Sequence, residues 1–177
     1  MKTYSFTFVV GDADPHSEDF EDRFFEAGCD DATLVLMHGA IALCFEREGI
    51  TYKNAVMSAY RDVLATGSQL LRFEPDFLVS AAEIANRAGL SRAAVSLYEK
   101  GERAENFPKP YARITTSSPL WDWVEVSRWL CTNGKLDVCE FRDAQVARFV
   151  NFGVQTSEEI TVVDEKLEKA LAEPFAA

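Results

Sequence analysis

Residues 3–10 (TYSFTFVV) alternate between polar and apolar side chains, many of them β-branched or aromatic. Such alternation is typical of a half-buried β-strand. Two later apolar runs flank His38-Gly39, which predicts a β-hairpin, and a third apolar run ends just before Pro75. These three further strands are predicted at residues 33–37, 40–45 and 69–73.

Two helices are predicted between these strands, because apolar residues recur there every three or four positions. The first is expected to begin at about Ser17 and to stop at Gly28, and the second is capped by Thr51 and stops at Gly67. Their apolar positions are Phe20, Phe24 and Ala27 in the first helix and Ala55, Val56, Ala59, Tyr60 and Val63 in the second.

The resulting order in residues 1–75 is β-α-β-β-α-β, which predicts a ferredoxin-like domain within a chain of the α+β class. That fold supports many unrelated functions, so the fold alone names none. Dimerisation, docking to another protein and ligand sensing are all open for this domain. The first two are protein contacts, and a protein contact is a simpler hypothesis than ligand sensing.

A different pattern begins at Val79. Ser80 and Glu83 have the spacing of a capping box, and a second capping residue, Ser91, follows Gly89 after one short helix. Two short helices joined by a tight turn that contains glycine are typical of a helix-turn-helix. Ala85 is small where the helices should cross, and Gly101 ends the second helix. The expected inward positions are Ile84, Ala88, Leu90, Val95 and Tyr98.

The sequence after this pair contains Phe107-Pro108-Lys109-Pro110, Arg113, and then Trp121, Val126 and Trp129-Leu130. This stretch resembles the AlpA-type phage regulators and excisionases, which are relatives of the MerR winged helices. In those proteins an FPxP wing and a W-x-x-x-x-V-x-x-W-L helix follow the recognition helix. The resemblance implies a winged helix-turn-helix over residues 76–133 and a prophage or mobile-element origin. Residues 102–120 are longer than in the most compact members of that family.

The same stretch predicts the roles of several residues. Asp122 and Glu125 have the spacing of a second capping box, at the start of the helix that carries Trp129. Trp121, Trp129 and Phe107 are expected in the core of the winged unit rather than as base-stacking groups.

A helix-turn-helix places the N-terminal part of its second helix in the major groove of DNA. Arg92 is the candidate for a guanine contact, and Ala93 or Leu97 for a thymine methyl group. Basic side chains from the helix end and the wing are candidates for phosphate or minor-groove contacts. The predicted DNA-binding residues are Arg92, Ala93, Ser96, Leu97, Lys100, Arg103, Lys109 and Arg113.

Residues 134–177 are predicted to form a helical tail with two apolar segments. Its expected apolar positions are Phe141, Val146, Phe149 and Val150, followed after Ser157 by Ile160, Val163, Leu167, Ala170 and Leu171. Such an amphipathic face packs on its own protein or serves as a dimer contact.

The net charge of −11 is the main objection to a nucleic-acid role. It is unevenly distributed, because residues 1–75 carry 6 basic and 13 acidic side chains, residues 76–133 carry 7 of each, and residues 134–177 carry 5 and 9. Charge effects are screened beyond a Debye length of about 8–10 Å, so an acidic protein can still bind DNA through one face. We expect a selective DNA binder with weak non-specific affinity.

Other classes of function find little support in the sequence. The chain has no apolar run long enough to cross a membrane, and its N-terminal residues are unlike a signal peptide. The four cysteines show no CxxC pair, which favours reduced thiols in the cytoplasm over disulfides or a metal site. Neither histidine has the spacing of a catalytic or ligating group. We therefore expect no enzyme activity, no cofactor and no metal.

These patterns together predict a cytoplasmic, site-specific, DNA-binding transcription regulator. Its expected partners are double-stranded DNA and a second copy of the chain, with residues 1–75 available for another protein partner. Two alternatives remain. One is an antitoxin-like regulator that neutralises a partner and represses its own operon. The other is a protein-interaction module whose helix-turn-helix no longer binds DNA.

Overall fold

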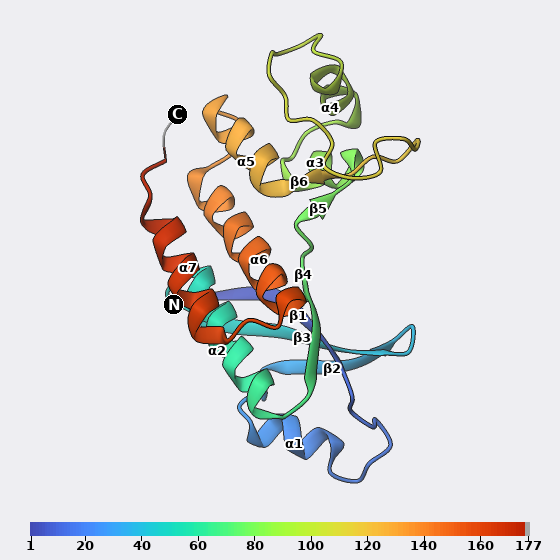
Figure 1. Cartoon of the computed structure of the whole chain (residues 1–177), viewed down its shortest axis with the longest axis vertical. Coiled ribbons are helices and arrows are strands. Elements are labelled where there is room, and N and C mark those ends of the chain that lie inside the picture. The colour runs from blue at the N-terminus through green and yellow to red at the C-terminus, as the bar shows by residue number, and fades with distance from the viewer. Residues whose placement is uncertain (176–177) are drawn as a thin grey trace. The chain divides into compact units, whose positions relative to one another are not determined.

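The computed structural model describes residues 1–175 and confirms the α+β class (Figure 1). The chain divides into two compact units, each described here by itself. Unit 1 contains Met1–Pro75 and Phe149–Ala172, and unit 2 contains Asp76–Arg148 and, of the described residues, 173–175. None of the described helices is long and apolar enough to cross a membrane.

Unit 1 is built on a four-stranded antiparallel sheet with the order β2-β3-β1-β4. All four strands were expected, the first from its alternating pattern and the other three from apolar runs. Their bounds are Lys2–Gly11 for β1, Ala32–Met37 for β2, Ala40–Gly49 for β3 and Gln69–Glu74 for β4. His38 and Gly39 join β2 to β3 with φ values of 50° and 79°, as a two-residue type I′ turn requires. The sheet therefore begins from a hairpin that the sequence specifies locally.

Helices α1 (Phe20–Glu26) and α2 (Tyr52–Ala65) connect the strands of unit 1. Thr51 caps α2, and its side chain accepts a hydrogen bond from the Asn54 N–H at 3.2 Å. The expectation that α1 begins near Ser17 was wrong by about one turn. Ser17 instead closes a turn on Asp14, to which its N–H and hydroxyl both donate.

The core of unit 1 lies between α2 and one face of the sheet. Phe8 is fully buried there, with its ring centroid 5.0 Å from that of Phe73 and 5.8 Å from that of Tyr60. Alternate residues of the strands supply this aromatic layer, which explains the period of two in the sequence.

The C-terminal segment forms two helices, α6 (Val138–Thr156) and α7 (Ile160–Ala172). The boundary between the two units falls within α6, so residues 134–177 do not form one separate tail. Helix α7 packs on α2, where Val163 and Leu167 are buried. Lys53 and Arg61 of α2 both reach Asp164 at 2.7 Å. Residues 1–75 are therefore only part of the unit to which they belong.

Cys29 is buried beside α2 in unit 1, and burial raises its pKa to about 11, with Asp62 contributing. The reactive form of cysteine is the thiolate, so this thiol should be nearly inert near neutral pH. We expect alkylation at pH 8 to modify the exposed Cys139 rapidly and Cys29 only after unfolding. Mass spectrometry of tryptic peptides measures both sites, and equal native rates for the two thiols would contradict the prediction.

Unit 2 begins with β5 (Leu78–Val79), α3 (Ala81–Arg87) and α4 (Arg92–Glu99). After a long loop come β6 (Trp121–Asp122), which pairs antiparallel with β5, and α5 (Trp123–Thr132). The first half of α6 completes the unit. One apolar cluster joins these elements, and its most buried members are Val79, Ile84, Val95, Trp121, Val126 and Leu130.

Candidate nucleic-acid interface

Local sequence signals define both ends of α3 and the start of α4. The capping box of α3 is confirmed, with Ser80 N–H donating to the Glu83 carboxylate at 2.7 Å and Glu83 N–H donating to the Ser80 hydroxyl at 3.3 Å. Burial alone would raise the pKa of Glu83, but these hydrogen bonds outweigh it and lower the pKa. Ser91 caps α4 by accepting from the Ala94 N–H at 3.1 Å.

The turn between α3 and α4 is tight because Gly89 has a φ of 63°, in the left-handed region that favours glycine. The next residue, Leu90, donates its N–H to the Ala85 carbonyl at 2.8 Å, which closes the end of α3. Ala85 itself is buried between the two helices, so the small side chain allows their close approach. The α3–α4 pair thus has the compact turn that the sequence predicted.

The inward face of the pair is largely as expected. Ile84, Val95 and Tyr98 are buried, whereas Ala88 and Leu90 are half-buried at the edge of the core. The opposite face of α4 is open to solvent: Arg92, Ala93 and Leu97 are exposed, and Ser96 is half-buried. All four predicted major-groove residues therefore lie on one helix face.

The C-terminal end of α4 is less favourable for binding phosphate than the exposed helix face. Lys100 and Arg103 are exposed as expected, but so are Glu99, Glu102 and Glu105 in the same short segment. Arg103 also lies over the Tyr98 ring, with its guanidinium carbon 5.6 Å from the ring centroid. The spacing of these three carboxylates is visible in the sequence, and they offset the charge of the neighbouring basic side chains.

An aromatic cluster anchors the loop that follows α4. Tyr98, Phe107 and Trp129 pack with ring centroids 5.0–6.1 Å apart. The indole N–H of Trp129 donates to the Glu105 carbonyl, and that of Trp121 donates to the Pro108 carbonyl, each at 3.1 Å. As expected, Trp121 belongs to the core, while Trp129 and Phe107 are half-buried against it.

Beyond this anchor, residues 111–120 form a projecting loop. Its base is one isolated β-bridge, in which Ala112 and Leu120 exchange backbone hydrogen bonds of 3.0 and 2.9 Å. The loop carries exposed side chains of Tyr111, Arg113 and Ile114, and Lys109 is exposed just before it. Lys109 and Arg113, the two basic residues predicted for the wing, thus lie on a loop.

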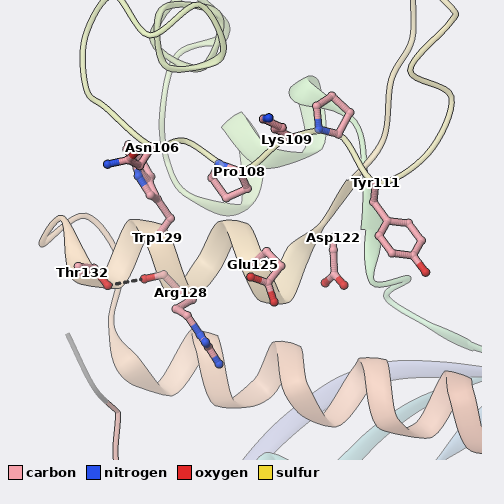
Figure 2. A pocket seen from close by; sticks show the side chains of 10 residues that line it. Asn106, Pro108, Lys109, Tyr111, Asp122, Glu125, Arg128, Trp129 and Thr132 are labelled. Atoms are coloured by element: carbon pink, nitrogen blue, oxygen red, sulfur yellow. Dashed lines mark hydrogen bonds between the residues drawn. The ribbon is translucent and has the colours of Figure 1, made fainter.

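A groove of about 620 Å³ runs between the segment 106–111 and α5 (Figure 2). Both signs of charge line it, with Lys109 and Arg128 opposed by Asp122 and Glu125. This groove is not a basic surface. Its charges are already partly neutralised, which makes it a poor candidate for the phosphate contact.

The second predicted capping box is only half formed. Asp122 caps α5 by accepting from the Val124 N–H at 2.9 Å, and its other oxygen lies 3.0 Å from Arg148. Burial raises the pKa of Asp122 despite this ion pair. Glu125 does not close the box as expected, because its carboxylate lies 3.8 Å from Arg148 instead.

The basic side chains of unit 2 differ in whether they have partners within the unit. Arg87 and Arg148 are engaged within the unit, with the Asp76 carbonyl and the Asp122 carboxylate respectively. In the part of the chain that the structure describes, the side chains of four predicted DNA-contacting residues have neither a hydrogen bond nor an ion pair: Arg92, Lys100, Lys109 and Arg113. These side chains are therefore free to bind a ligand.

The division into units also separates the charge. Unit 2 carries 10 basic and 11 acidic side chains, whereas unit 1 carries 8 and 18. Nearly all of the net charge of −11 thus belongs to unit 1. Within residues 1–175 there is no group of three or more potential metal ligands.

No protein family, curated protein sequence or solved structure was found to match this chain.

Proposed function

We propose that the protein binds double-stranded DNA at specific sequences through the exposed face of α4, as a transcription regulator. The observation that carries the proposal is a pair of short helices, each capped by a serine at its N-terminus. The outer face of α4 is open to solvent and carries Arg92, whose side chain has no hydrogen bond or ion pair within the described residues. A surface helix whose inner face is fixed by a core can enter the major groove without unfolding its own unit.

Each candidate residue has a distinct role in this proposal. Arg92, in the first turn of α4, donates two hydrogen bonds to guanine, while Ala93 and Leu97 contact thymine methyl groups or exclude water. Lys109 and Arg113 contact phosphate or the minor groove from the projecting loop. Lys100 and Arg103 contribute less, because Glu99, Glu102 and Glu105 offset their charge at that end of α4.

Replacing Arg92 with alanine is expected to lower specific DNA affinity by ~1–3 kcal/mol and to relax the preference at one base position. Selection from random DNA sequences, followed by anisotropy titrations on the selected site, measures both effects. Arg142→Ala is the matched control, because Arg142 is also an exposed, unpaired arginine of unit 2 but lies on α6. An unchanged affinity and an unchanged selected sequence for Arg92→Ala would remove this residue from the interface.

A salt titration tests the electrostatic part of the proposal. Each phosphate contact contributes about −0.9 to the slope of log affinity against log salt. With roughly 4 contacts from one unit, we expect a slope near −3 to −4. Replacing both Lys109 and Arg113 with alanine should make this slope less steep by nearly 2.

The alternative is a protein-interaction module in which the same helix face binds a protein instead of DNA. The exposed Glu99, Glu102 and Glu105 beside Lys100 favour this alternative, since mixed charge suits a protein surface better than phosphate. A salt slope near zero together with no selected DNA sequence would make it the better hypothesis.

A further inference from the structure

The two edge strands of the sheet in unit 1 differ in whether their outward backbone groups are hydrogen-bonded. The edge at β4 is closed by Asn151 of α6, whose side-chain amide accepts from the Phe73 N–H at 3.0 Å and donates to the Phe73 carbonyl at 2.9 Å. At the edge formed by β2, the Ala32 N–H donates to the Cys29 carbonyl at 3.0 Å, but no hydrogen bond joins the outer side of Leu34 or Leu36 to any other described segment. One edge is therefore blocked and the other is open.

The register of the β2–β3 hairpin shows which groups face the open edge. Met37 pairs with Ala40 across the two-residue turn, so Met37 and Val35 bond inward to β3. Leu34 and Leu36 alternate with them and direct their N–H and C=O groups away from the sheet. These are the groups that an added strand would bind.

Strand β2 lacks the features that usually prevent pairing at an edge. Its sequence, ATLVLM, contains neither charge nor proline, and the strand has no bulge. Leu36 and Met37 are 59% and 52% exposed near the hairpin tip. An uncharged, apolar edge in a chain of net charge −11 indicates a contact surface.

The other end of β2 borders an open groove of about 440 Å³ between the strand and α1. Phe25, which is 66% exposed, lines its apolar side together with Leu34, and Asp22 and Asp30 make its rim acidic. The hairpin tip at the opposite end of the strand carries apolar side chains and His38. Tip and groove are thus complementary in hydrophobicity, His38 can donate a hydrogen bond to a rim carboxylate, and tip and groove lie at opposite ends of one strand.

We propose that β2 pairs antiparallel with β2 of a second copy of this chain, about a two-fold axis at Val35. In this register Leu34 and the partner's Leu36 exchange both backbone hydrogen bonds, which uses every outward group of the two residues. Each tip then reaches the other copy's groove, with the partner's His38 next to Asp30. The contact joins two four-stranded sheets into one sheet of eight strands.

A second copy fits this edge better than a different protein, because one segment supplies both halves of the contact. A two-fold interface requires such self-complementarity and closes after two subunits, since the described sheet of unit 1 offers one open edge in each copy. The proposal rests on unit 1 alone and does not depend on DNA binding.

A cysteine at the proposed axis gives a direct test. Val35 would lie opposite the partner's Val35 in a non-hydrogen-bonded pair, with Cα atoms about 4.5 Å apart, within the ~4.4–6.8 Å range of disulfides. In the full chain with Cys44→Ser and Cys139→Ser, mild oxidation of Val35→Cys should yield a covalent dimer, and the first of these changes removes the cysteine that pairs with position 33 in the same chain. Thr33→Cys is the control, because Thr33 shares the strand and face but pairs with the partner's Met37 in this register. Equal crosslinking at both positions, or none at Val35→Cys, would overturn the register.

Sedimentation of the full chain without added cysteines tests the interface itself. We expect a dimer at micromolar concentration and a weakening of about tenfold or more in Leu36→Lys, which places charge at the edge. Ile50→Lys is the matched control, since Ile50 is 80% exposed outside β2 and should leave the dimer intact. A monomeric parent protein, larger open assemblies, or a dimer that Leu36→Lys does not weaken would each refute the proposal.

Discussion

Trp121→Ala is expected to destabilise unit 2 by ~3–5 kcal/mol, as large-to-small substitutions of buried aromatic residues do. Trp121 is 1% exposed and is the largest fully buried side chain in the chain's described part. It joins β6 to β5 through its pairing with Val79, and its indole N–H holds the Pro108 carbonyl. Domains are stable by only about 5–15 kcal/mol, so a large part of unit 2 should be unfolded or loosened.

Hydrogen exchange resolved by unit is the suitable measurement, because a chain with two units need not unfold in one step. We expect faster exchange throughout α3, α4 and α5 and a loss of DNA affinity that exceeds that of Arg92→Ala. Trp121→Phe is the control. It keeps most of the ring volume and loses the hydrogen bond to Pro108, so its cost should be smaller and centred on residues 102–110. Exchange in Trp121→Ala that remains at the parent rate would contradict the assigned role in the core.

Arg47→Ala is expected to destabilise unit 1 by a similar amount, ~3–5 kcal/mol, because it breaks a buried ionic network from its centre. Arg47 is 8% exposed and donates hydrogen bonds to Asp31 at 2.7 and 2.8 Å, to Asp62, to Ser58 and to the Gly28 carbonyl. Burial alone would lower its pKa, but the hydrogen bonds to Asp31 and Asp62 outweigh that effect and raise it. The arginine therefore stays charged, and its removal leaves two partly buried carboxylates uncompensated.

The buried Cys29 thiol reports this change, since it lies on the segment that Arg47 holds in place. In Arg47→Ala we expect Cys29 to be alkylated much faster at pH 8 than in the parent protein. In a urea titration, Cys29 should become reactive at a lower urea concentration. Tryptophan fluorescence serves as the internal control, because all three tryptophans of the chain lie in unit 2. Arg47→Lys keeps the positive charge but loses the planar guanidinium group. Its Cys29 alkylation rate should therefore lie between those of the parent protein and Arg47→Ala. A parent-like Cys29 rate in Arg47→Ala would show that the network contributes little.

Some features of this protein follow from the sequence alone, because short-range interactions decide them. The side chains of the capping residues Thr51, Ser80 and Ser91 each accept a hydrogen bond from the backbone N–H three residues later. The turn glycines Gly39 and Gly89 adopt positive φ values that other residues disfavour. The alternating strands and the α+β class follow from the same local rules, and for that reason they were predictable.

Other features depend on residues distant in sequence, and only the tertiary structure decided them. The C-terminal segment was predicted as one helical tail with two apolar segments, but its residues pack in two different units, so the segment is divided between them. Glu125 had the spacing of a capping residue, yet Arg148, 23 positions later, attracts its carboxylate. Similarly, the blocked edge of the sheet arises from Asn151, 78 positions after the strand residue that it covers. Long-range packing selects among partners that are locally equivalent, and a pattern read along the chain contains no information about that choice.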